Sequence, residues 1–189
     1  MSNLILSVGS LLLFSTFLRT SLTWMKVNDQ VVQQNEYYIT AVSLAQAIID
    51  EAKTKSYDQK TDTSGVTTPD SLTGHTKLGP DAGETIPKPD AITSASPYSS
   101  TSLGYRSTYK FNDVDDYRTY WRLVNTQRAE GFNINVMVNY VNETNPDVVS
   151  GSTPTFCKKM TVIVSSPYLV DASNANLPLN VVLSYVFSY

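Results

Sequence analysis

The first eighteen residues carry no charge, and this run constrains the fold more than any other feature. No Asp, Glu, Lys or Arg occurs between Met1 and Leu18, and Arg19 is the first charged residue. As a helix, the run is about 27 Å long, close to the ~30 Å hydrocarbon core of a bilayer. Three interpretations are open: a secretory signal, a permanent membrane anchor, or a segment that leaves the membrane and is buried against copies of itself. No Lys or Arg precedes the run, which is atypical of a secretory signal.

The uncharged run continues into an amphipathic stretch. No proline precedes Lys55 and the only glycine before it is Gly9, so the sequence predicts one helix over residues 1–55. Residues 1–25 are apolar on all sides, whereas 26–55 carry one apolar stripe with spacings of mostly three and four, which we expect to pack on a sheet. The stripe consists of Val27, Val31, Tyr38, Val42, Ala45, Ile49 and Ala52, widened by Ala41, Leu44 and Ile48.

Apolar and polar residues alternate in the last third of the chain, which is typical of strands with one buried face. We expect strands at Phe132–Asn142, Lys159–Ser165 and Leu179–Tyr189, a fourth around Arg118–Thr126, and turns at Glu143–Pro154 and Ser165–Pro178. Residues 111–189 are therefore predicted to form an antiparallel sheet domain. A long helix on one face of such a sheet is an α+β fold.

Residues 56–110 form a surface region without apolar periodicity. Between Thr54 and Thr108 there are twenty Ser or Thr and five Pro residues. Such a long irregular stretch is either a mobile linker or a loop held by its own domain or by neighbouring subunits. The composition is also typical of O-glycosylated segments, so O-glycans are a candidate modification.

Composition excludes several functions. A net charge of -3 with 16% charged residues argues against nucleic acid as a partner. One cysteine and one histidine cannot build a zinc site, and no phosphate-binding loop is present. His75 lies in a polar segment and is expected to be solvated, while Cys157 is buried, free or used between subunits, with burial favoured. The sequence thus predicts no enzyme activity and no cofactor.

An acidic cluster is the one candidate for metal binding. Asp113, Asp115 and Asp116, beside Asn112, offer the hard oxygen ligands that calcium prefers. Their spacing is not that of an EF-hand loop. The alternative is an acidic turn that is solvated or caps the backbone.

Three segments together resemble type IV pilin-like proteins, the family of pilins, minor pilins and pseudopilins. They are the run MSNLILSVGSLLLFSTFL leading into a long helix, the segment Phe111-Asn-Asp-Val-Asp-Asp-Tyr117, and the strand pair FNINVMVNYV and KKMTVIVSSP. The resemblance implies a lollipop-shaped subunit that sits in the inner membrane before joining an extracellular homopolymeric filament. If Met1 is the mature N-terminus, Ile5 replaces the Glu that the family usually carries there. Leu22 stands where pilins commonly have Pro.

In such a filament, residues 1–25 would pack against the same segment of neighbouring copies. The expected assembly residues are Leu4, Ile5, Leu6, Val8, Leu11, Leu12, Leu13, Phe14, Phe17, Leu18, Arg19, Leu22, Trp24 and Met25. Arg19 needs a partner there, for which Asp29 or Glu36 of another subunit, or the C-terminal carbonyls of a neighbouring helix, are candidates. The alternatives are a membrane-anchored surface module that binds a partner, and a minor pilin or pseudopilin of a pilus or secretion machine.

Overall fold

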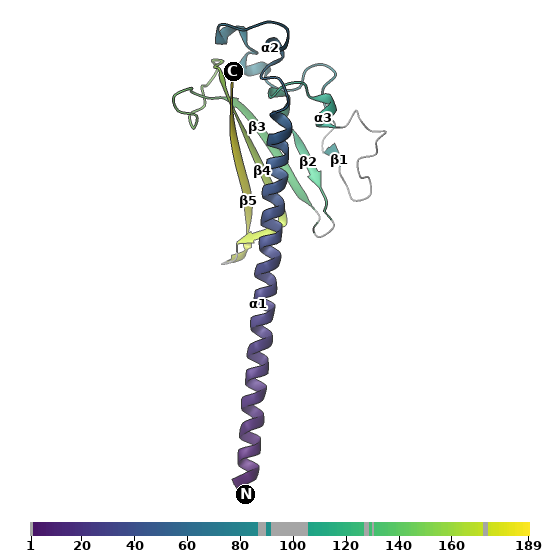
Figure 1. Ribbon diagram of the computed structural model, residues 1–189, viewed down its shortest axis with the longest axis vertical. Coiled ribbons are helices and arrows are strands. Elements are labelled where there is room, and N and C mark those ends of the chain that lie inside the picture. The colour runs from purple at the N-terminus through teal and green to yellow at the C-terminus, as the bar shows by residue number, and fades with distance from the viewer. Residues whose placement is uncertain (1, 87–89, 92–105, 127–128, 130, 172–173) are drawn as a thin grey trace.

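The molecule consists of one long helix with a sheet packed against its C-terminal part (Figure 1). The computed structural model describes residues 2–86, 90–91, 106–126, 129, 131–171 and 174–189. Helix α1 spans Ser2–Ala52. Its first part, residues 2–36, projects beyond the rest of the chain and is called the stem; the remainder is the head. This arrangement confirms the predicted α+β fold.

The head is built on four antiparallel strands that neighbour one another in chain order. They are β2 (Trp121–Val124), β3 (Phe132–Tyr140), β4 (Cys157–Asp171) and β5 (Asn174–Ser188). A two-residue strand, β1 (Asp90–Ala91), adds to β2 in the parallel sense. β3 confirms the strand expected from Phe132, and Glu143–Pro154 is a loop, as expected.

Three strand predictions were wrong in their bounds. The turn expected at Ser165–Pro178 is largely strand, because β4 and β5 continue past a register shift between Ser165 and Val170. The polar composition hid this extension, in which Pro178 of β5 pairs with Val170; an edge strand tolerates proline. The fourth strand is shorter than Arg118–Thr126, because Thr119 has a positive φ of 65° that interrupts extended backbone before β2.

The core lies between α1 and one sheet face. Phe132, Ile134, Val136 and Val138 alternate inward on β3, and Met160, Val162 and Val164 do so on β4. From the helix, the stripe residues Ala41, Ala45, Ile48, Ile49 and Ala52 are buried against them. Three alanines in this set have no exposed surface, so the backbone of α1 approaches the sheet closely.

The stripe packs on the head over a shorter stretch than residues 26–55. Val27, Val31 and Tyr38 are exposed, which contradicts their predicted place against the sheet. For Val27 and Val31 the reason is their position: they come before Tyr37, whose ring lies 5.3 Å from that of Tyr168 on β4. Tyr38 follows this contact but lies on the exposed side of the helix. Residues before Gln34 are almost all exposed and extend past the described part of the head.

Short helical turns interrupt the region after α1, which was expected to lack regular structure. They are α2 (Gln59–Thr63), η1 (Pro69–Ser71), η2 (His75–Lys77) and α3 (Ser107–Lys110). Leu72 and Leu78 pack with Tyr140 in a second small core, so this part of the region is held by its own domain. Residues 87–89 and 92–105 lie outside the described residues, and the O-glycan prediction stays untested.

Replacing Ile48 with alanine should destabilise the head by about 2–5 kcal/mol, since Ile48 is 1% exposed and truncation leaves a cavity. Ile39→Ala is the matched control on the same helix, because Ile39 is 64% exposed. Its expected effect is within about 0.5 kcal/mol. Urea unfolding in detergent, followed by near-UV circular dichroism, measures both. Equal losses would contradict the assigned packing face.

Candidate functional site

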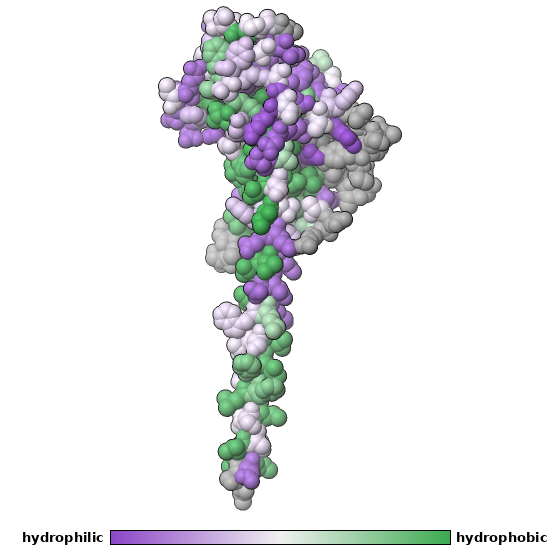
Figure 2. Space-filling view, in the orientation of Figure 1, coloured by the Kyte–Doolittle hydropathy of each residue, from purple (hydrophilic) through white to green (hydrophobic). Residues whose placement is uncertain are grey.

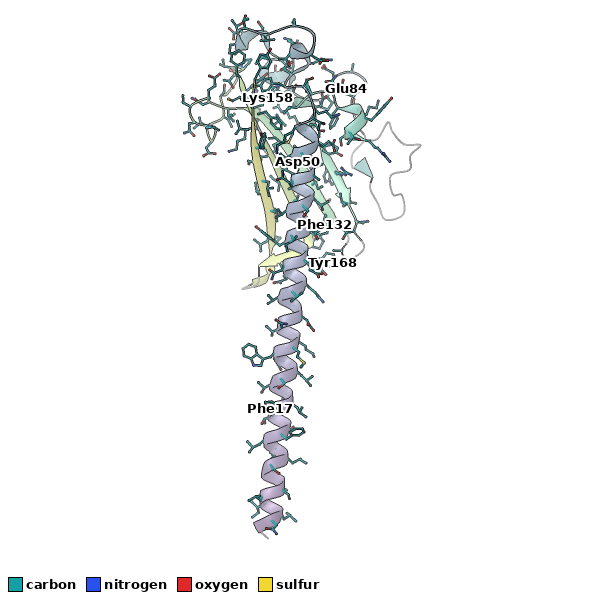
Figure 3. All side chains as sticks on the ribbon, in the orientation of Figure 1. Phe17, Asp50, Glu84, Phe132, Lys158 and Tyr168 are labelled. Atoms are coloured by element: carbon teal, nitrogen blue, oxygen red, sulfur yellow. The ribbon has the colours of Figure 1, made fainter. Side chains whose placement is uncertain are left out.

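The stem exposes apolar side chains on every side. All thirteen apolar residues expected in the assembly interface, from Leu4 to Met25, are between 45% and 77% exposed. Figure 2 shows these hydrophobic residues along the projecting helix, and Figure 3 shows Phe17 pointing away from the axis with no other element near it. An apolar surface of this length on a folded chain marks an interaction site.

Five hydroxyl groups of the stem are hydrogen-bonded within the helix. The hydroxyls of Ser7, Ser10, Thr16, Thr20 and Thr23 each donate a hydrogen bond of 2.8–2.9 Å to a carbonyl three or four residues earlier. Moving an unpaired hydroxyl out of water would cost free energy. These five hydroxyls keep their hydrogen bonds when water is removed, because the acceptor carbonyls belong to the same helix. These five side chains can therefore enter a water-free environment without leaving a hydroxyl unpaired.

The charges of the stem are confined to its half nearest the head. Arg19, Lys26, Asp29 and Glu36 are the only charged residues up to position 36. Arg19, Lys26 and Asp29 are exposed and have no ion-pair partner among the residues that the structure describes. Glu36 is half-buried at the base of the head. Any water-free surroundings for this half must supply partners for Arg19, Lys26 and Asp29.

By length and composition, α1 is able to cross a membrane. It contains a window of eighteen residues with mean hydropathy 1.5, none of which is buried in the molecule. Residues 3–25 alone are about 35 Å long at 1.5 Å per residue, enough for the ~30 Å hydrocarbon core.

A buried ion cluster lies in the head where three segments meet, and sequence reasoning missed it. The Lys158 ammonium on β4 lies 2.9 Å from Asp58 Oδ2 and 2.5 Å from Asp115 Oδ1, and it donates to the carbonyl of Tyr57. Lys158 and Asp58 have no exposed surface (Lys158 is labelled in Figure 3). We call Lys158, Asp58 and Asp115 the ion cluster. It joins β4 to the segment after α1 and to the turn η4 (Asp115–Tyr117).

The acidic residues proposed as calcium ligands are engaged otherwise. Asp113 Oδ1 accepts the backbone N–H groups of Asp115 and Asp116, and its Oδ2 accepts that of Gln59. Asp116 Oδ2 accepts the N–H groups of Asn112 and Asp113, while Asp115 faces Lys158. Within the described residues no group of acidic, His or Cys side chains is arranged to hold a metal ion. These carboxylates close a turn, which is the alternative that the sequence left open.

Burial is the largest influence on the pKa values of the carboxyl groups in this turn. It raises the pKa of Asp113 to about 8, helped by Asp115 and Asp116, and that of Asp116 to about 6. Burial also raises the pKa of Asp115, although Lys158 opposes the shift. For Asp58, burial is outweighed by the Lys158 ammonium and backbone donors, so its pKa is lowered.

The head should therefore become less stable as pH rises from 5 to 8. Asp113 and Asp116 have raised pKa values when folded, against about 3.9 when unfolded, so in this window the folded state binds more protons and stability falls with pH. The lowered pKa of Asp58 acts only below this window. Melting temperatures at pH 5 and 8 measure the effect. Asp113→Asn should flatten the slope even where it lowers overall stability; an unchanged slope would contradict the assignment.

The two lone reactive residues are not brought together. His75 lies in η2 and its carbonyl accepts a 2.7 Å hydrogen bond from Arg118. Cys157 begins β4 as a free thiol and is half-buried, so the favoured prediction of a buried side chain was wrong. It sits near the end of the sheet, outside the main core, where burial is incomplete.

The expected assembly residues thus lie together on one projecting helix. Asp113, Asp115 and Asp116 instead make contacts within the head. Comparison of the chain with protein-family models, with curated proteins and with solved structures gives no match.

Proposed function

We propose that this chain is the structural subunit of an extracellular, type IV pilus-like filament, built by packing the stems of many copies into a central bundle with the heads outside. The observation that carries the proposal is the stem: its first half is an exposed helix with apolar side chains on every side, and the same helix continues without a break into the folded head. Lipid of the inner membrane would cover the same surface before assembly.

The energetic argument concerns the stem in water. Burying one Leu, Ile, Val, Phe or Met side chain is worth about 1.5–3 kcal/mol, so thirteen such residues represent on the order of 20 kcal/mol or more. That surface must be covered by lipid or protein. The hydroxyls bonded within the helix suit either. The small residues Ser7, Gly9, Ser10, Ser15 and Thr16 favour protein, because they let helices approach closely.

Electron microscopy of the full chain tests the proposal. We expect the protein purified in detergent to form filaments of uniform diameter when the detergent is removed, with a sedimentable fraction that grows with concentration. Discrete particles under all conditions, combined with stable insertion into lipid vesicles, would instead establish the membrane-anchored surface module. Filaments formed only with a second, more abundant subunit would make this a minor pilin or pseudopilin.

A further inference from the structure

The ion cluster holds a buried amine against a buried carboxyl group. The Nζ of Lys158 lies 2.5 Å from Oδ1 of Asp115, so the carboxyl carbon, one bond beyond that oxygen, is at most about 3.7 Å away. Reacting atoms in a near-attack arrangement are about 3–3.5 Å apart. We propose that Lys158 and Asp115 condense after folding into an isopeptide bond, which joins β4 covalently to the turn η4. The ion cluster is the arrangement before this reaction.

The reaction needs no reagent beyond the side chains themselves. The nitrogen of Lys158 forms a bond to Cγ of Asp115, and the bond from Cγ to one carboxyl oxygen breaks. Of the three protons on the ammonium, two leave in net terms with that oxygen as water, and the third stays on the amide nitrogen. One positive and one negative charge disappear together, so the net charge is unchanged and nothing is oxidised or reduced.

Asp58 is placed to take the first proton from the ammonium. Its Oδ2 lies 2.9 Å from the Nζ of Lys158. Burial opposes the ionisation of Asp58, but the Lys158 ammonium and the backbone N–H groups of Lys60 and Thr73 outweigh burial and lower its pKa. An ionised carboxylate accepts protons and is a poor target for a nucleophile. Asp58 therefore acts as the base and not as the bond partner.

Asp115 has the opposite surroundings. Burial raises the pKa of its carboxyl group, although Lys158 opposes the shift. The carboxyl groups of Asp113 and Asp115 are hydrogen-bonded, and because burial raises the pKa of Asp113 to about 8, Asp113 is the protonated donor near neutral pH. Asp113 can thus protonate the oxygen that departs from Asp115. Once water has formed, Asp58 gives up its proton and Asp113 regains one.

Exclusion of water favours condensation at this site. The side chains of Lys158 and Asp115 are 0% and 4% exposed. The ring centroids of Tyr57 and Tyr140 lie 4.6 and 5.4 Å from the lysine nitrogen. Two buried charges carry a large desolvation cost, which a neutral amide does not, so the bond relieves that cost. The fixed positions of the two groups make the reaction effectively unimolecular.

The bond would give the head a covalent restraint that it otherwise lacks. The chain has one cysteine and so has no internal disulfide. The loop between Asp115 and Lys158 contains β2 and β3. Closing it restricts the unfolded chain in the way that a disulfide does, which stabilises the folded head. The bond lies within one head and forms whether or not the chain assembles, so it is independent of the proposed filament.

The intact mass of the full-length chain, measured after denaturation, tests the bond. We expect the wild type to be lighter than its sequence requires by one water molecule. Lys158→Arg keeps a cation that stays protonated and is no nucleophile, and Asp115→Ala removes the carboxyl group, so each should have the full mass. Lys159→Met is the matched control and should keep the water loss, because Lys159 belongs to an ion pair whose partner, Asp147, is 88% exposed.

Peptide mapping identifies the two residues that are joined. After digestion of the wild type, we expect a branched peptide that links the segment of Lys158 to that of Asp115. A full wild-type mass would overturn the proposal, and so would water loss that survives Lys158→Arg, because a succinimide elsewhere in the chain also removes water. A branch at Asp58 would overturn the assigned roles of the two aspartates. Each of these results leaves the proposed function standing.

Discussion

Replacing Lys158 with methionine is expected to lower the free energy of unfolding of the head by about 3–5 kcal/mol. The methionine side chain is close in length to the aliphatic part of lysine, so the main change is the loss of the ammonium group. Asp58, with no exposed surface, and Asp115, at 3%, would then be buried without their cation. Leaving a buried charge unpaired is among the most destabilising single changes. Urea unfolding in detergent, followed by near-UV circular dichroism of the tyrosine-rich head, measures it.

The adjacent residue supplies the matched control. Lys159 also lies on β4 and pairs with a carboxylate, Asp147, at 2.7 Å, but that partner's side chain is 88% exposed. An exposed pair contributes about 0–1 kcal/mol, so Lys159→Met should have little effect. Similar losses for the two variants would show that the ion cluster does not stabilise the head beyond an ordinary surface pair. Asp58 also accepts the N–H of Lys60 and Thr73, so its own replacement is a less clean test.

The main elements could be predicted because each depends on a local pattern. A proline-free run of more than fifty residues predicts α1, and strict alternation predicts β3. Where the packing partner stops could not be predicted in this way. Val31 and Ile49 belong to the same apolar stripe, yet only Ile49 is buried, because Val31 comes before the part of α1 that packs on the described sheet, where Tyr37 meets Tyr168. The position of the β4–β5 hairpin depends on tertiary packing, which the local periodicity of the sequence does not encode.

The ion cluster was missed although a local signal existed. Met160, Val162 and Val164 were assigned to the inward face of β4, and the same alternation taken two residues back places Lys158 on that face. A lysine at an inward position requires buried carboxylates. Asp115 stood in the segment that we considered for calcium, but Asp58 comes from a region without periodicity. Their meeting therefore depended on the fold of the chain after α1.

The stem residues were predicted from the uncharged N-terminal run and the family resemblance, and the structure adds that no described residue of the head covers the apolar ones. The acidic residues show the opposite case. Asp113 and Asp116 were read as possible metal ligands because carboxylates close in sequence suggest shared chemistry. Instead, each accepts backbone N–H groups from the turn itself. Backbone donors within a few residues compete for such oxygens, and their direction is set by φ and ψ angles that the sequence does not display.

Replacing Phe17 with lysine should raise the concentration needed for assembly about 100-fold while leaving the head folded. In the proposed bundle the new ammonium lies among apolar side chains in every subunit, where a Lys costs about 2.5–3.5 kcal/mol by membrane-insertion scales. That corresponds to about a 100-fold rise in the concentration needed for assembly. Phe17 is 66% exposed in the single chain, so the same change creates no cavity and no clash there. Sedimentation after detergent removal, over a range of protein concentrations, gives the threshold.

Tyr109→Lys is the control that separates assembly from general surface chemistry. Tyr109 is an aromatic residue of the head with 68% exposure, nearly that of Phe17, so the two substitutions change charge and apolar surface to a similar extent in the single chain. Because the heads lie outside the proposed bundle, the threshold of this variant should match that of the wild type. Near-UV circular dichroism should be native-like for both variants. If Phe17→Lys assembled at the wild-type threshold, the stem would not be the buried core of the filament, since a lysine in every copy cannot be accommodated there without loss.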